Sequence, residues 1–116
     1  MRHRKKGRKF HRERDQRKSL LKTLGSNLIL KEHIITTESR AKELRRFIEK
    51  KFTTAKKGDI AAIRNLRKYF SGRIVQKLIK EIAPLLKKRK GGYTRLTKIG
   101  KRTTDGARMV KIEIIR

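Results

Sequence analysis

The chain has 116 residues, a length that corresponds to one domain. Lys and Arg number 37 against 10 acidic residues, and the resulting formal net charge of +27 weakens the compact state by self-repulsion and attracts polyanions. The absence of cysteine excludes disulfides and thiolate metal sites. We expect no membrane span and no signal peptide, because no apolar segment has the necessary length.

The N-terminal residues are predicted to form a basic arm. Ten of the first eighteen residues are Lys or Arg, and Phe10 is the one large apolar side chain apart from Met1. Such a segment cannot bury enough apolar surface to offset the entropy lost on ordering. We therefore expect residues 1–14 to become ordered against a polyanion, and residues 15–116 to form a single compact α/β domain.

The first predicted helix follows the arm directly and has about fifteen residues. Its apolar face consists of Leu20, Leu21, Leu24 and Leu28. Asp15 is expected to cap this helix. Gly25 lies inside it at a cost of about 1 kcal/mol relative to Ala, which indicates a close helix crossing or, as the alternative, a kink.

The second predicted helix follows a short β-branched strand at residues 33–36. Thr36 or Thr37 is expected to cap it, with Glu38 at its positive end, and Gly58 is expected to terminate it. Its apolar face consists of Ala41, Leu44, Ile48, Phe52 and Ala55.

Two shorter helices are predicted before residue 87. Asp59 is expected to cap the first of them. Its apolar face consists of Ile60, Ile63, Leu66 and Phe70. The second follows Ser71 and Gly72, and its apolar residues are Ile74, Val75, Leu78, Ile79 and Ile82. Pro84 disfavours helical backbone at Ala83 and is expected to close this element there or nearby, with room for one more turn at Leu85 and Leu86.

The C-terminal region is predicted to form an antiparallel hairpin. Residues 93–99 and 109–115 are the two strands, and residues 100–107 form the loop between them. Together with the strand at residues 33–36 they are expected to give a small mixed three-stranded sheet packed against about four helices. The predicted fold class is therefore α+β, with helices covering one face of the sheet.

A second basic cluster extends from Lys87 to Arg102 and contains eight Lys or Arg residues and no acid. Gly91 and Gly92 allow the backbone to approach a phosphate closely. Tyr93 either stacks on an unpaired base or packs in the core, and packing is the favoured interpretation.

The candidate RNA-binding residues come from the arm, its junction with the first helix, and this second cluster. They are Arg2, His3, Arg4, Lys5, Lys6, Arg8, Lys9, Arg12, Arg14, Arg17, Lys18, Lys87, Lys88, Arg89, Lys90, Tyr93, Arg95, Lys98, Lys101 and Arg102.

A third basic surface is the outer face of the helix predicted after Thr37. Its cations are Lys42, Arg46, Lys50 and Lys57. Contact with phosphates and a solvated face with Glu38–Lys42 or Glu43–Arg46 ion pairs are equally compatible with this pattern.

Catalysis is not expected. The acidic residues are dispersed, and no carboxylate pair, nucleophile–base pair or phosphate-binding glycine loop emerges. The spacing of His3, His11 and His33 fits no metal site. We therefore predict neither a metal nor a cofactor. His3 and His11 are assigned to the arm's RNA contacts, and His33 to a structural role.

Several ordered motifs resemble one known family. They are residues 1–5 with Gly7-Arg8-Lys9, residues 28–34, residues 36–45, residues 55–59, residues 81–84, and residues 91–95 followed by Lys98. Through them the sequence resembles the bacterial large-subunit ribosomal protein number seventeen family over essentially the whole chain. It departs at residues 10–18, where the family shows small and hydroxyl residues leading to a His-Arg pair, and at residues 67–75.

The resemblance implies a structural, non-enzymatic constituent of the large ribosomal subunit with a mixed α/β fold. Such a protein binds and braces large-subunit ribosomal RNA near the nascent-chain exit, beside neighbouring large-subunit proteins. It implies a cytoplasmic location in the bacterial ribosome, in preference to an organellar one, with no membrane partner and no requirement for a homo-oligomer.

Two alternatives to a ribosomal protein are open from composition alone. A histone-like DNA-compacting protein would form a symmetric dimer and bind duplex DNA and ribosomal RNA comparably. A cationic membrane-surface protein would need exposed apolar helix faces, whereas the predicted faces are committed to one core.

Overall fold

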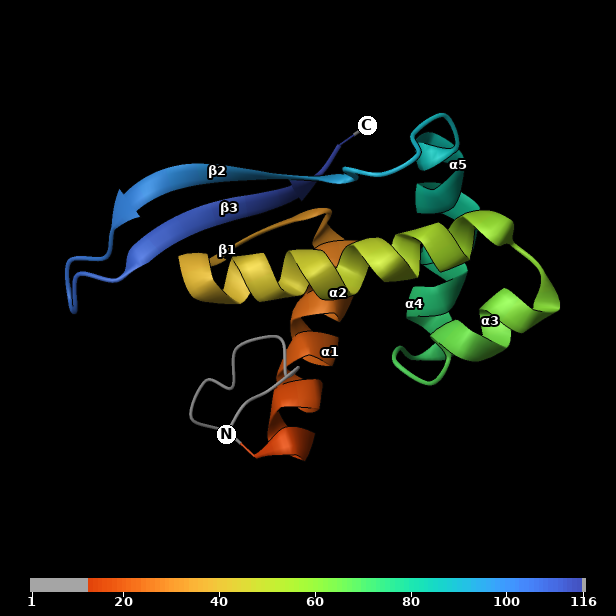
Figure 1. The fold of residues 1–116 in the computed structure, drawn as a ribbon, viewed down its shortest axis with the longest axis horizontal. Coiled ribbons are helices and arrows are strands. Elements are labelled where there is room, and N and C mark those ends of the chain that lie inside the picture. The colour runs from red at the N-terminus through yellow and green to blue at the C-terminus, as the bar shows by residue number, and fades with distance from the viewer. Residues whose placement is uncertain (1–12, 116) are drawn as a thin grey trace, which may run out of the picture.

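The computed structural model describes residues 13–115, and Figure 1 shows their arrangement. The helical elements are α1 (Arg14–Lys31), α2 (Glu38–Lys57), α3 (Ile60–Leu66), α4 (Gly72–Lys77), the π-helical η1 (Leu78–Ile82) and α5 (Ala83–Leu86). The strands are β1 (His33–Thr37), β2 (Thr94–Lys101) and β3 (Arg108–Ile114). Because α4, η1 and α5 follow one another directly, the described residues contain four helical segments and one sheet, which confirms the α+β class.

The sheet has the strand order β1-β3-β2, and both pairings are antiparallel. Ile112 of the central strand lies opposite Ile34 of β1 and Leu96 of β2. Ile112 is fully buried against the helices, whereas Ile35 on the opposite face is 61% exposed. The helices therefore cover one face of the sheet, as the alternating pattern of β3 predicts.

Helix α2 is the centre of the core, lying between the sheet and the other helices (Figure 1). Thr37 caps it by accepting a hydrogen bond from the Arg40 N–H at 3.4 Å. Gly58 terminates it with a positive φ of 64°, a conformation that glycine adopts without strain. All five residues of the predicted apolar face are buried. The prediction of this helix is confirmed at both ends and along its face.

Gly25 marks the place where α1 crosses α2. A Cβ atom there would lie 3.2 Å from Ile48 Cδ1 and 3.2 Å from Phe70 Cε1. These distances are shorter than ordinary van der Waals contact, and α1 continues through Gly25 to Lys31. The close crossing, the first of the two interpretations, is the one that the structure supports.

The start of α1 differs from the prediction. Glu13 is the N-cap and forms no side-chain capping bond, so the expectation that Asp15 caps the helix is wrong. Asp15 instead lies in the first turn, where its charge favours the positive end of the helix dipole. Arg14, which the prediction placed in the arm, is the first helical residue.

Most of the face predicted for the α3 region is buried, but its first residue is not: Leu66 and Phe70 lie in the core and Ile63 packs against it. Asp59 caps it as expected, accepting a hydrogen bond from the Ala62 N–H at 2.7 Å. Ile60, however, is 69% exposed, whereas Ala62 and Leu66 are buried. The short helix ends at Leu66, so Phe70 enters the core from beyond it.

The last helix does not end at Ala83 but closes nearby, after the one further turn that was expected to fit at Leu85 and Leu86. The chain stays helical to Leu86 because a π-helical turn precedes the proline. In this turn the Ala83 N–H donates to the Leu78 carbonyl, five residues back. Pro84, which has no N–H to donate, follows this turn as the second residue of α5.

Truncation of the α2 face should destabilise the whole domain. Ile48 is fully buried at the crossing of α1 and α2, so we expect Ile48→Ala to lower the free energy of unfolding by about 2–4 kcal/mol. Arg46→Ala, an exposed change on the same helix, should alter it by less than about 0.5 kcal/mol. Urea denaturation of both variants measures the difference, and equal midpoints would contradict the assigned face.

Candidate nucleic-acid interface

The described candidate residues occupy three separate places on the domain. Arg14, Arg17 and Lys18 lie on the N-terminal turns of α1, residues 87–90 follow α5, and residues 95–102 extend along β2 into the hairpin loop. The remaining candidates lie outside the described residues: Arg2, His3, Arg4, Lys5, Lys6, Arg8, Lys9 and Arg12.

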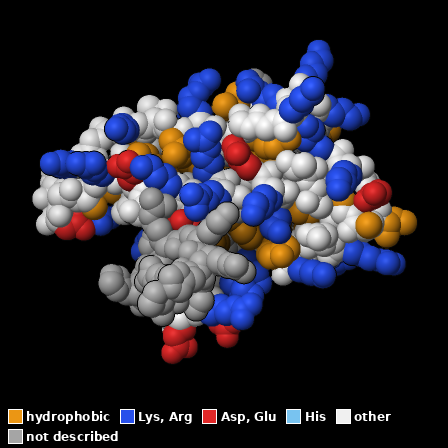
Figure 2. All heavy atoms as spheres, viewed as in Figure 1, with side chains coloured by type: hydrophobic (Ala, Val, Ile, Leu, Met, Phe, Trp, Pro, Cys, Tyr) orange, Lys and Arg blue, Asp and Glu red, His pale blue; other side chains and the backbone are white. Residues whose placement is uncertain are grey.

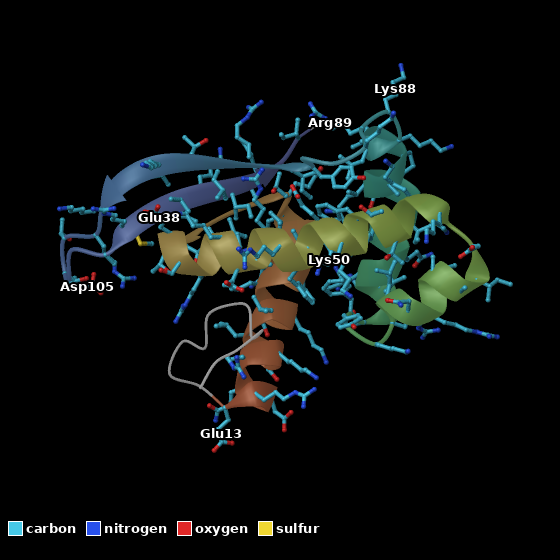
Figure 3. The ribbon with its side chains drawn as sticks, in the orientation of Figure 1. Glu13, Glu38, Lys50, Lys88, Arg89 and Asp105 are labelled. Atoms are coloured by element: carbon cyan, nitrogen blue, oxygen red, sulfur yellow. The ribbon has the colours of Figure 1, made fainter. Side chains whose placement is uncertain are left out.

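The basic cluster at residues 87–102 is divided in space. Lys88 and Arg89 lie beside the end of α5, whereas Asp105 marks the hairpin tip at the other end of β2 (Figure 3). Since β2 has eight residues, about 25 Å separates its two ends. The interpretation of one continuous cluster is therefore corrected to two patches, which we call the α5 patch (residues 87–90) and the hairpin patch (residues 101–102).

The α5 patch is held in place by a lysine that the sequence did not single out. The Lys56 ammonium group donates hydrogen bonds to the Arg89 carbonyl and, at 3.1 Å, to the Tyr93 hydroxyl. The Arg89 N–H also donates to the Leu86 carbonyl at 3.0 Å. The backbone of the turn is thus fixed while the four side chains of the patch remain exposed.

Tyr93 is a core residue, so its candidate role in stacking on a base is corrected. It is 1% exposed, and its ring meets the Phe52 ring edge-on at 6.1 Å. Burial raises the pKa of the Tyr93 hydroxyl, but hydrogen bonds from Thr53 and Lys56 and the charge of Lys56 outweigh burial and lower it. The ring offers no surface to a ligand, as the packing interpretation expected.

Arg102 organises the hairpin loop. Its guanidinium group donates to both carboxylate oxygens of Asp105, at 2.9 and 2.6 Å. Asp105 also accepts from the Ala107 N–H at 3.1 Å. These bonds, led by that from Arg102, lower the pKa of the Asp105 carboxyl to about 2. Part of the charge of Arg102 is therefore neutralised within the loop.

Two further candidates on β2 have acidic neighbours. The Arg95 guanidinium lies 3.8 Å from the Glu113 carboxylate, although Arg95 remains 62% exposed. Lys98 lies near Glu38, whose pKa is lowered first by a hydrogen bond from Lys42 and further by the charge of Lys98. The middle of β2 is thus more nearly neutral than either of its ends.

The outer face of α2 contains one of the ion pairs that its sequence allowed, whereas phosphate contact by this face stays a prediction. Lys42 pairs with Glu38 at 3.0 Å, as in a solvated helix face. Arg46 and Lys50, by contrast, line an open groove together with α1 and the segment that follows α3. We call this the α1–α2 groove. Sequence analysis did not predict it, because its walls lie far apart along the chain. In Figure 2, Lys and Arg side chains surround exposed hydrophobic atoms on this face.

Within residues 13–115, no group of three or more His, Cys, Asp or Glu side chains could hold a metal ion. No helix in this part of the chain is long and apolar enough to cross a membrane. The fold and its surface define a small, strongly basic α+β protein with exposed cations grouped around one core.

The family is given by comparison with known proteins. The model of the ribosomal protein L17 family matches residues 20–115. Proteins named large ribosomal subunit protein bL17 are 44% identical in Staphylococcus epidermidis, over 93% of this chain and 98% of the relative, and 45% identical in an Exiguobacterium species, over 92% and 97%. The relative from Dehalococcoides mccartyi is 43% identical over the full length of both chains. The chain belongs to the ribosomal protein L17 family, whose members are structural, non-enzymatic components of the large ribosomal subunit.

The Arg102–Asp105 pair should make the stability of the hairpin loop depend on pH. The folded carboxyl has a pKa of about 2 against an ordinary 3.8, so its contribution to loop stability is present above the ordinary value and is lost as pH falls through about 2. We expect Arg102→Gln to raise the pKa of Asp105 toward 3.8, measured by the carboxyl carbon shift in an NMR titration. Lys101→Gln, the adjacent control, should leave it low, and an equal shift in both variants would contradict the pairing.

Lys56→Met should release the α5 patch. The loss of the ammonium group removes a hydrogen bond and a positive charge from the Tyr93 hydroxyl, so the pKa of Tyr93 should rise. Tyrosine ring resonances followed through an alkaline titration measure this change. Lys57→Met, which alters an exposed neighbour, is the matched control. An unaltered Tyr93 titration in the Lys56 variant would show that the hydrogen bond between Lys56 and Tyr93 does not exist in solution.

Proposed function

We propose that this chain binds and braces large-subunit ribosomal RNA near the nascent-chain exit, beside neighbouring large-subunit proteins in the bacterial cytoplasm. The contacts are made to phosphates by the basic arm, the α5 patch and the hairpin patch. Membership of the family supports the assignment to the large ribosomal subunit. The net charge of +27 supports binding to a densely anionic partner.

The separation of the two patches by the length of β2 is the observation that carries the proposal. Both patches are attached to one sheet and one core, so the distance between them is nearly constant. Neutralising phosphates at fixed points on a rigid body holds RNA segments that repel one another at a set separation. A flexible basic tail supplies charge but cannot set that distance.

Bracing by phosphate contact predicts affinity with a strong salt dependence and little sequence preference. Each neutralised phosphate releases counterions and adds about 0.7–0.9 to the slope of log affinity against log salt. Arginine contributes beyond its charge, because its planar group contacts a phosphate through two parallel hydrogen bonds.

Deletion of residues 2–12 tests the arm. It removes seven Lys or Arg residues and leaves the N-cap Glu13 and the whole of α1 intact. We expect an unchanged thermal melt, sharply weaker binding to protein-free large-subunit ribosomal RNA, and a salt slope that is smaller by about 5–6. Duplex DNA of the same mass is the competitor. An unchanged slope, or equal affinity of the full chain for duplex DNA, would contradict the proposal.

The location can be tested with a directed probe. Because the chain has no cysteine, Lys88→Cys provides a single attachment point for an iron chelate that cleaves nearby RNA. After assembly into large subunits, cleavage should fall on RNA that surrounds the nascent-chain exit. Thr103→Cys, an exposed position in the hairpin loop beyond the other end of β2, should give a different pattern. Cleavage confined to RNA remote from the exit would contradict the proposed location.

A further inference from the structure

Three segments that are distant in sequence form the α1–α2 groove. They are the N-terminal half of α1, the middle of α2, and the residues that follow α3. Since α1 crosses α2 at Gly25, the part of α1 that precedes the crossing diverges from α2 and leaves an open corner between them. Figure 1 shows α1 leaving the crossing at a steep angle to α2.

The groove is strongly cationic. Its basic residues are Lys18, Lys22, Arg46, Lys50, Lys51 and Lys68. The two carboxylates in its lining are Glu43, which is 8% exposed, and Glu49, which accepts two hydrogen bonds from Thr94. Six positive and two negative groups leave a net charge of +4 in one concave surface, and concavity concentrates the field.

Aromatic rings hold one of these cations in position. The Lys51 ammonium group lies 3.5 Å from the centre of the Tyr69 ring and 5.4 Å from the centre of the Phe47 ring. Lys22 approaches the same Tyr69 ring at 5.8 Å. The Tyr69 and Phe47 rings meet edge-on at 5.7 Å, which fixes their orientation. Lys51 is therefore ordered before any ligand arrives, so less side-chain entropy is lost on binding.

The other cations are placed at regular intervals. Arg46 and Lys50 are four residues apart, about 6 Å along the axis of α2, and Lys18 and Lys22 repeat this spacing on α1. Figure 3 shows Lys50 near the middle of α2. Two rows of cations on diverging helices suit an extended, evenly charged chain better than a single compact anion.

We propose that the α1–α2 groove is an additional RNA-binding site that holds the phosphate backbone of one RNA strand, with Lys51 as its pre-oriented contact. The inference rests on the proposed function and adds a surface to it. The ring of Tyr69 acts through Lys51 and not by stacking on a base, because Lys51 already lies over the ring. The groove includes residues of the N-terminal half of α1. The basic arm precedes this helix directly in sequence, so the groove adds to the basic surface at that end of the chain.

A charge-matched pair of triple variants tests the groove in the full chain. Arg46→Gln/Lys50→Gln/Lys68→Gln removes three exposed groove cations, and Lys57→Gln/Arg64→Gln/Lys80→Gln removes three exposed cations elsewhere. Binding to protein-free large-subunit ribosomal RNA is measured across a salt series. We expect the groove variant to lose about tenfold or more in affinity relative to the control, with a slope smaller by about 2–3.

The outcomes distinguish failure of the groove site from failure of RNA binding as a whole. Equal losses in both triple variants, with a large loss on deletion of residues 2–12, would overturn the groove site alone. No loss in any of the three would overturn RNA binding itself. Poly-glutamate is the probe for an acidic protein partner. If the groove variant loses affinity for it as strongly as for RNA, selective binding of an RNA strand is overturned.

The role of the aromatic rings has its own test. Tyr69→Phe keeps the ring beneath Lys51 and should leave RNA affinity within about twofold, whereas Tyr69→Leu removes the ring and should weaken binding. The same pair is then compared in a Lys51→Gln background. If Tyr69→Leu has no further effect there, the ring acts through Lys51 as proposed. An equal loss with and without Lys51 would overturn this step, and thermal melts identify any loss of folding.

Discussion

Burial of the apolar face of α2 is the interaction on which the rest of the structure depends. This helix contacts α1, α3, η1, α5 and all three strands, so both the sheet and most of the other helices pack against it. Ile48 and Phe52 are fully buried, and each such side chain contributes about 1.5–3 kcal/mol when removed from water. In a chain with a net charge of +27 that attraction opposes a strong self-repulsion. Helix α2 is amphipathic, so its apolar face lies in the core while none of its Lys and Arg residues is buried.

Some of the cations also have structural roles. Lys77 donates to the Leu30 carbonyl at 2.6 Å in the last turn of α1, Lys56 fastens the turn after α5, and Arg102 closes the hairpin loop through Asp105. These contacts fix the backbone at the places from which exposed cations project. A rigid distribution of positive charge loses little entropy on meeting RNA, which is the physical basis of the bracing that we propose.

The sequence by itself determined the local structure and the family. Thr37 and Asp59 cap their helices and Gly58 ends α2 because these signals depend only on adjacent backbone groups. The alternation of β3 predicted which of its side chains are buried, since a strand has two faces whatever it packs against. The family followed from motifs in order along the chain, and the matching relatives confirm it.

Tertiary structure alone decided where the charges gather. The run of basic residues from Lys87 to Arg102 forms two patches because β2 is extended. Tyr93 is buried because Phe52 and Lys56 of α2 contact it. The continuation of the last helix through Pro84 required a π-helical turn that no local signal indicated. The α1–α2 groove exists only because a crossing at Gly25 brings distant segments together. Periodicity predicts which face of an element is apolar, but the relative placement of elements determines which cations share a surface.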